Sequence, residues 1–149
     1  MSFNTLAVLD AIVTLLTETL SAEQVTIGAP LSISKKLTAY VTLGAQPQGI
    51  KTQGTIWRDA RFFIDFAYRV DDNIPDDVAT AESTLAATLD ALEQAIYDDK
   101  TLDGVCFDTI IEAGTTEEPE YRIRAAREFR EYAVILTCRQ YTTYEVNPT

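Results

Sequence analysis

The stretch that decides the fold is Ile56–Val70, IWRDARFFIDFAYRV, in which most of the apolar side chains lie two positions apart. Successive side chains of a β-strand point to opposite faces of the sheet, so this alternation predicts one long strand. Its apolar face holds Ile56, Phe62, Ile64, Phe66, Tyr68 and Val70. Its other face is mixed and holds Trp57, Asp59, Arg61, Phe63, Asp65, Ala67 and Arg69. A mixed face often meets another protein surface, although the edge of a monomer core would look similar.

Two segments have the periodicity of helices. Apolar residues from Leu6 to Leu20 recur at spacings of three and four, and Asn4 or Ser2 can cap this helix. Further apolar positions widen the stripe, which predicts burial on two sides. The second helix covers residues 78–96 and follows the acidic turn 71–77, where negative charge suits a helix N-terminus.

The remaining segments complete an α+β chain. Residues 37–43, 105–112 and 128–146 are predicted strands, whereas the polar stretch Gly44–Gly54 is predicted to be a mobile loop, too long for a tight hairpin. The order is α-β-β-α-β-β in a single domain, 1–149. It predicts a four-stranded antiparallel or mixed sheet with both helices packed on one face.

Composition excludes several classes of protein. The chain has 149 residues, no histidine and a formal charge of −11, which argues against a surface that reads DNA or RNA. The lack of histidine also removes the commonest general base and metal ligand. No apolar run is long enough to span a membrane, and the first twenty residues lack the cationic start of a signal peptide.

The motifs that could carry chemistry are incomplete. Cys106 and Cys138 are expected to be buried small hydrophobes in a reducing compartment. Gly49–Thr55 has the glycine spacing of a phosphate loop but lacks its lysine, and Asp71–Asn73 lacks the glycine of a calcium loop. Acidic pairs such as Asp98 with Asp99 come with no nucleophile. We therefore expect no enzyme, no cofactor, and no catalytic or metal site.

Charge is unevenly distributed along the chain. Arginines gather after residue 121, while acidic residues crowd 71–77 and 90–103. One surface would then be positive and another negative, which favours head-to-tail packing of identical subunits. Ion pairing within one subunit is the alternative.

Three local patterns resemble the tail terminator proteins of long-tailed bacteriophages. Leu85–Ile96 followed by Asp99–Val105 (DKTLDGV) resembles that family's second helix and the turn after it. Tyr121–Ile123 and Tyr132–Arg139 resemble its last strands. The order of elements is similar over most of the chain.

The resemblance implies a structural virion protein at the head-proximal end of the tail, assembled in the host cytoplasm. Such proteins form a homo-oligomeric ring, usually a hexamer, that caps the tail tube, ends its polymerisation and joins it to the head. The implied partners are the tail tube protein and a head-completion protein. Six copies at −11 each carry −66, so DNA would cross the lumen without specific binding.

The candidate residues for these contacts come from the charge and loop patterns. Subunit-interface candidates are Trp57, Arg61, Arg69, Arg122, Arg124 and Arg127. The loop expected to face the tube or head offers Gln46, Gln48 and Lys51. Alternatives are another head-tail connector or tail-tube component, a small acidic binding module, or an enzyme.

The charge segregation generates one prediction of its own. Arg124→Glu should break the ring, because it puts a negative charge where the positive surface would meet its acidic neighbour. Light scattering on the purified variant measures this, and an oligomer of unchanged size would contradict it.

Overall fold

Two long antiparallel strands form the centre of the sheet. The computed structural model describes residues 3–20, 22–33, 35–113, 119–124 and 127–144, without the side chains of Ala113 and Arg124. Strands β4 (Thr55–Val70) and β7 (Arg127–Thr143) pair without a register shift from Thr55 opposite Thr143 to Val70 opposite Glu128. At about 3.4 Å per residue, this ribbon is roughly 50 Å long.

Each outer edge of the ribbon carries an interrupted strand. β2 (Leu37–Leu43) and β3 (Gln48–Thr52) both pair antiparallel with β4. β5 (Asp108–Ala113) and β6 (Glu120–Arg124) both pair antiparallel with β7. Strand β1 (Gln24–Ile27) adds a parallel partner to β2. The sheet is therefore mixed, with the order β1-β2-β4-β7-β5.

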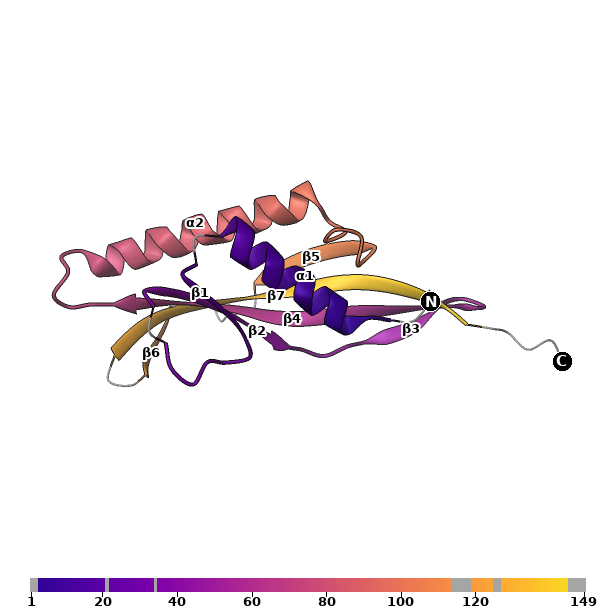
Figure 1. Ribbon diagram of the computed structural model, residues 1–149, viewed down its shortest axis with the longest axis horizontal. Coiled ribbons are helices and arrows are strands. Elements are labelled where there is room, and N and C mark those ends of the chain that lie inside the picture. The colour runs from indigo at the N-terminus through magenta and orange to yellow at the C-terminus, as the bar shows by residue number, and fades with distance from the viewer. Residues whose placement is uncertain (1–2, 21, 34, 114–118, 125–126, 145–149) are drawn as a thin grey trace.

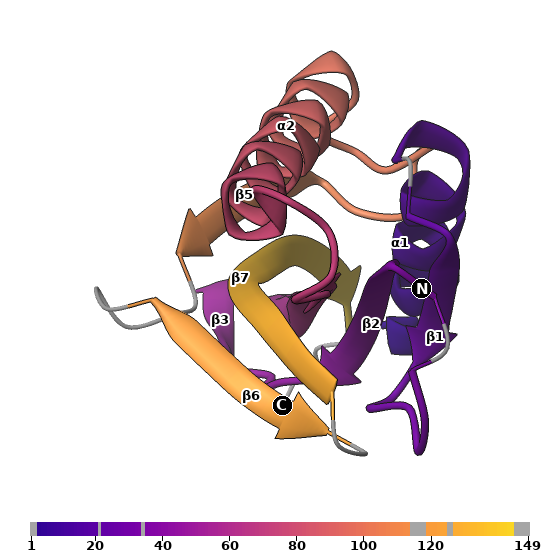
Figure 2. The same cartoon turned by 90° about the vertical axis from the view of Figure 1, so that its left-hand side faces the viewer.

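Both helices lie on one face of this sheet, as Figures 1 and 2 show. α1 (Thr5–Thr19) is capped by Asn4, whose side-chain oxygen accepts a hydrogen bond from the Ala7 backbone N–H at 3.0 Å. α2 (Asp77–Asp98) is the longer helix. Neither described helix has the length and apolar character needed to cross a bilayer.

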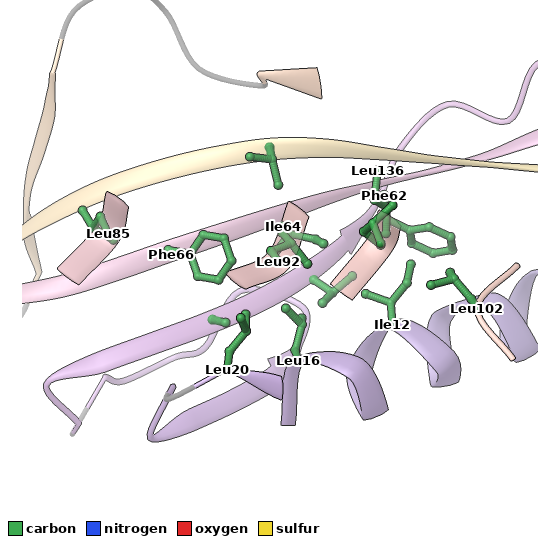
Figure 3. Close-up of a cluster of buried hydrophobic side chains, with 14 of the residues drawn as sticks. Ile12, Leu16, Leu20, Phe62, Ile64, Phe66, Leu85, Leu92, Leu102 and Leu136 are labelled. Carbon is green, nitrogen blue, oxygen red and sulfur yellow. The ribbon is translucent and has the colours of Figure 1, made fainter. Parts of the chain in front are cut away.

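The core lies between the helices and the sheet (Figure 3). α1 contributes Ile12 and Leu16, and α2 contributes Leu85 and Leu92. The sheet side consists of the predicted apolar face of β4 together with alternate residues of β2 and β7: Leu37, Ala39, Val41, Phe62, Ile64, Phe66, Val134, Leu136 and Cys138. Burial of these apolar surfaces is the main favourable term in folding.

The α+β class is confirmed, with its two helices on one face, but the predicted count of four strands is wrong. The sheet has seven strands, and β1, β3 and β6 are the additional ones. β1 has only four residues, and β3 (QGIKT) and β6 (EYRIR) are too polar to show a buried face in the sequence. Backbone pairing with a long neighbour, rather than side-chain pattern, makes them strands.

The expected mobile loop Gly44–Gly54 is also wrong. Its second half is β3, which forms a hairpin with β4 through Gln53 and Gly54, and Gly54 has a φ of +89°. Its first half bonds to β4, because the Gly44 N–H donates to the Arg61 carbonyl at 2.8 Å and the Asp59 N–H donates to the Pro47 carbonyl at 2.9 Å. Glycine supplies the positive φ that this turn requires.

The buried side of α1 also differs slightly from the expected stripe. Val8, Ile12 and Leu16 are fully buried, whereas Leu6 is 64% exposed. Leu9, Val13 and Leu15 are partly buried against the core. The helix therefore buries one side fully and a second side in part.

A polar cluster joins the start of α2 to the ends of two strands. The carboxylate of Asp77 accepts hydrogen bonds from Lys36 Nζ at 2.7 Å, the Asp71 backbone N–H at 2.7 Å and the Tyr68 hydroxyl at 3.2 Å. Lys36 also bonds Asp71 at 2.8 Å, and its ammonium lies 4.9 Å from the centre of the Tyr68 ring. Asp77 is almost fully buried, so these bonds replace the water that the carboxylate has lost.

These contacts move the pKa of both partners. Burial acts to raise the pKa of Asp77, but the bonds from Lys36 and from the Asp71 N–H outweigh it and lower that pKa below 3.8. Burial acts to lower the pKa of Lys36, but the bonds to Asp71 and Asp77 outweigh it and raise that pKa above 10.5. The stabilisation from Asp77 is thus complete above pH 3.8 and is lost as the pH falls through its folded pKa. The stabilisation from Lys36 is complete below pH 10.5 and is lost as the pH rises through its folded pKa.

Asp77→Asn should lower the free energy of unfolding by about 1 to 3 kcal/mol, because it leaves the Lys36 ammonium without its shorter bond. The variant should also lose less stability than the wild type as the pH falls below 3.8, because it lacks the Asp77 carboxylate that is protonated there. Urea unfolding at pH 7 and at pH 3 measures both effects. The exposed Asp72→Asn is the matched control, expected within about 0.5 kcal/mol of wild type. Equal loss in the two variants would contradict the role of the cluster.

Candidate interaction surface

The two cysteines form a buried group with Thr109. The Thr109 hydroxyl donates to the Lys100 carbonyl at 2.7 Å and lies 3.3 Å from Cys106 Sγ and 3.9 Å from Cys138 Sγ. The hydrogen bond with Cys106, together with burial, raises the pKa of the Cys138 thiol. A buried protonated thiol packs as a small apolar group and is a poor nucleophile. Within the part of the chain that the structure describes, no three His, Cys, Asp or Glu side chains gather as a metal site would require.

The hollow between α2 and the sheet is small. Its volume is about 160 Å³, and it is lined by Glu82, Leu85, Ala86, Leu89, Arg130 and Tyr132. Binding sites for drug-sized molecules are usually about 300 to 1,000 Å³. The polar side chains at its mouth are paired, because Arg130 Nε donates to Glu82 Oε1 at 2.6 Å. This hollow therefore offers a small molecule little room and few free polar groups.

The face of the sheet opposite the helices, which we call the open face, carries the mixed side of β4. On β7, Ile135 lies directly opposite Phe63 and Thr137 lies opposite Arg61. On β5, Ile110 lies opposite Thr137. Directly opposed residues of antiparallel strands point to the same side. The register thus brings together four side chains, which we call the sheet patch: Arg61, Phe63, Ile110 and Ile135.

The sheet patch is accessible in a single copy of the chain. Phe63 is 38% exposed and Ile110 is 52% exposed, and Ile135 is half-buried between them. Arg61 is exposed, and among the described residues its side chain has neither an ion pair nor a hydrogen bond. Apolar side chains that adjoin one another around an arginine are typical of protein interfaces.

Trp57 lies further along the open face and is engaged within the chain. The Arg139 guanidinium lies 4.4 Å from the centre of the Trp57 ring and donates to both carboxylate oxygens of Asp59, at 2.7 and 2.9 Å. The ring also rests on Gly49 of β3, where an added Cβ would come within 2.9 Å of it. Ion pairing within one subunit, which the sequence left open as the alternative, thus holds for Asp59 and Arg139. The interface role predicted for Trp57 stays a prediction.

The other arginine candidates lie apart from the sheet patch. Arg69 pairs with Asp71 at 3.3 Å. Arg122 pairs with Glu120 at 2.6 Å and with the buried Glu131 at 3.0 Å. Arg127 is exposed at the start of β7, and Arg124 ends β6 with a side chain that lies outside the described part. Arg61 is therefore the candidate that the register joins to an exposed apolar cluster.

The candidates from the stretch 44–54 have three different environments. The Gln46 amide nitrogen donates to the carbonyl of Arg61 at 3.0 Å, so its side chain bonds to β4. Gln48 is exposed on β3. The Lys51 ammonium lies over the Tyr141 ring, 4.2 Å from its centre. Phe107, which is 66% exposed, meets the same ring edge to face at 5.1 Å. A contact with tube or head proteins stays a prediction for all three candidates.

Neither helix carries a basic residue. All twelve Lys and Arg residues lie outside α1 and α2, whereas the two helices carry Asp10, Glu18, Asp77, Glu82, Asp90, Glu93 and Asp98. The helices thus carry acidic but no basic side chains, whereas the strands and loops carry every cation together with the remaining acidic residues. The sequence also separates arginines after residue 121 from acidic residues in 71–77 and 90–103. The absence of Lys and Arg from both helical segments is a second separation that can be read from it.

Comparisons with known proteins give likenesses among solved structures only. No protein-family model matches the sequence, and no curated protein matches it. Among solved structures, the chain is similar to the sheath/tube terminator in the extended state of an extracellular contractile injection system, PVC, determined by cryo-EM. The two are 11% identical with a TM-score of 0.49, and the match covers 100% of this chain and 64% of that one. This chain thus spans a little under two thirds of the length of that structure.

The contacts of Arg139 with Trp57 and Asp59 can be tested by substitution, with a variant of Arg61 on the open face as the control. Arg139→Ala should lower the free energy of unfolding by about 1 kcal/mol, because it removes a two-point ion pair and a stacked cation. It should also change the emission of Trp57, the single tryptophan. Arg61→Ala should change the free energy of unfolding by less than about 0.5 kcal/mol and leave the emission unchanged. Urea unfolding followed by tryptophan fluorescence measures both, and similar behaviour of the two variants would refute this assignment.

Proposed function

We propose that this chain is a structural, non-catalytic component of a phage-like tail. In this proposal it forms a ring on the end of the tail tube, stops tube polymerisation and offers the surface to which the head joins. The observation that carries the proposal is the sheet patch, an exposed apolar cluster around an arginine that lacks a described partner. The resemblance of residues 85–146 to tail terminator proteins supports the same conclusion.

The division of charge supports assembly from identical copies. Helices without a single Lys or Arg and an open face with the exposed Arg61 give each copy two surfaces of different composition. Contacts between unlike faces are head-to-tail, and they close into a ring when the rotation between neighbours divides a full turn. We propose six subunits, which carry −66 together and would repel DNA in transit.

The proposal also names partners and a place. The tail tube protein would meet one rim of the ring and a head-completion protein the other, at the head-proximal end of the tail. Gln48 and Lys51, which are exposed on the β3–β4 hairpin, are the candidates for one of these rims. Assembly would take place in the cytoplasm of a bacterial host.

The proposal predicts a discrete oligomer and an effect on tubes. Light scattering should give the purified chain one species of six times its 16.5 kDa mass. If the chain alone is smaller, six copies should assemble once tube protein is added. Substoichiometric amounts added to polymerising tube protein should shorten the tubes, and electron microscopy should find labelled chain only at tube ends. Label along the whole tube would indicate a tube subunit instead. A monomer that leaves tube length unchanged would overturn the proposal.

A further inference from the structure

The outward side of α2 is a surface that the fold leaves uncovered. The buried positions of the helix, such as Leu85, Leu92 and Ile96, face the sheet. The opposite side is exposed along its length, and we call it the helix stripe: Ser83, Ala86, Ala87, Asp90, Gln94 and Tyr97. Tyr97 is 66% exposed. Within the described part of the chain, the Asp90 carboxylate has neither an ion pair nor a hydrogen bond.

The helix stripe and the sheet patch are complementary in charge. The patch has one exposed cation, Arg61, next to apolar side chains of β4, β5 and β7, and the exposed Glu112 lies opposite Ile135 at its β5 edge. The stripe has one central anion, Asp90, with the small side chains Ala86 and Ala87 one turn before it and Tyr97 two turns after it. Arginine and carboxylate pair well in a partly buried contact, because the guanidinium fork matches the two oxygens.

The two surfaces also fit in size. Neighbouring strands lie about 4.8 Å apart, so the three strands of the patch span roughly 10 Å, which is close to the width of one helix with its side chains. The small residues of the stripe let a flat surface come close to the helix axis. A standard interface covers about a tenth of a small protein's surface on each partner, and α2 alone is about 33 Å long.

We infer that the sheet patch of one copy docks on the helix stripe of the next, with Arg61 opposite Asp90. This rests on the proposed function in that it specifies the contact between neighbouring subunits of the ring. The two surfaces lie on opposite sides of the two-layer fold, as Figures 1 and 2 show for the helices and the sheet. Each copy can therefore contact one neighbour through its sheet patch and another through its helix stripe. In a finite assembly, every patch and every stripe is covered only when the copies close into a ring.

A charge-swap series tests this contact. Arg61→Glu and Asp90→Arg should each weaken self-association at least about tenfold, because each puts like charges in contact. The double variant Arg61→Glu with Asp90→Arg should recover wild-type association, since every contact regains an opposite pair. Light scattering over a dilution series measures the association, and thermal unfolding checks that each variant folds.

Matched controls come from exposed charges elsewhere. Lys35→Glu and Glu18→Lys make the same changes of charge outside both surfaces, and both should assemble like wild type. Failure of the double variant to recover, or unchanged assembly of both single variants, would overturn the inference while the ring itself stands. A wild-type chain that stays monomeric with and without tube protein would overturn the proposed function as well.

Discussion

The unshifted pairing of β4 with β7 is the constraint on which the rest of the molecule depends. Every other strand except β1 bonds directly to one of these two, and β1 bonds to β2. The pairing also separates the chain's side chains into two sets. One set meets both helices and forms the core, and the other forms the open face. A slip of one residue would exchange the sets and bury Arg61 and Asp65 against the helices, so burial itself fixes the register.

Much of this arrangement is present in the sequence as pattern. The alternation in Ile56–Val70 identifies the long central strand and its apolar face, and the spacing in residues 78–96 identifies α2. Strands β3 and β6 are not readable, because their side chains form no apolar face and their strand conformation depends on hydrogen bonds to β4 and β7. Glycine and glutamine in Gly44–Gly54 indicate a loop by composition, although a hairpin needs the same residue types.

The interaction surface is less predictable than the fold. Phe63, Ile110 and Ile135 are far apart in sequence, and only the register brings them together. Likewise, the pairing of Asp59 with Arg139 joins residues 80 positions apart, so a sequence cannot tell an internal ion pair from an intersubunit one. Two features were readable from the start: the mixed face of β4 and the absence of cations from both helical segments.

That absence of cations has a practical consequence for chemical probes. Reagents that modify lysine can reach Lys35, Lys36, Lys51 and Lys100 but cannot label either helix, whereas reagents that modify carboxylates can label both. Trypsin likewise has no cleavage site within α1 or α2 and leaves the whole of α2 on one peptide, residues 70–100. Amine-directed footprinting therefore reports on strands and loops alone, whereas carboxyl-directed footprinting reports on the helices as well, so a change in carboxylate labelling within α1 or α2 without a change in lysine labelling indicates a partner on the helices.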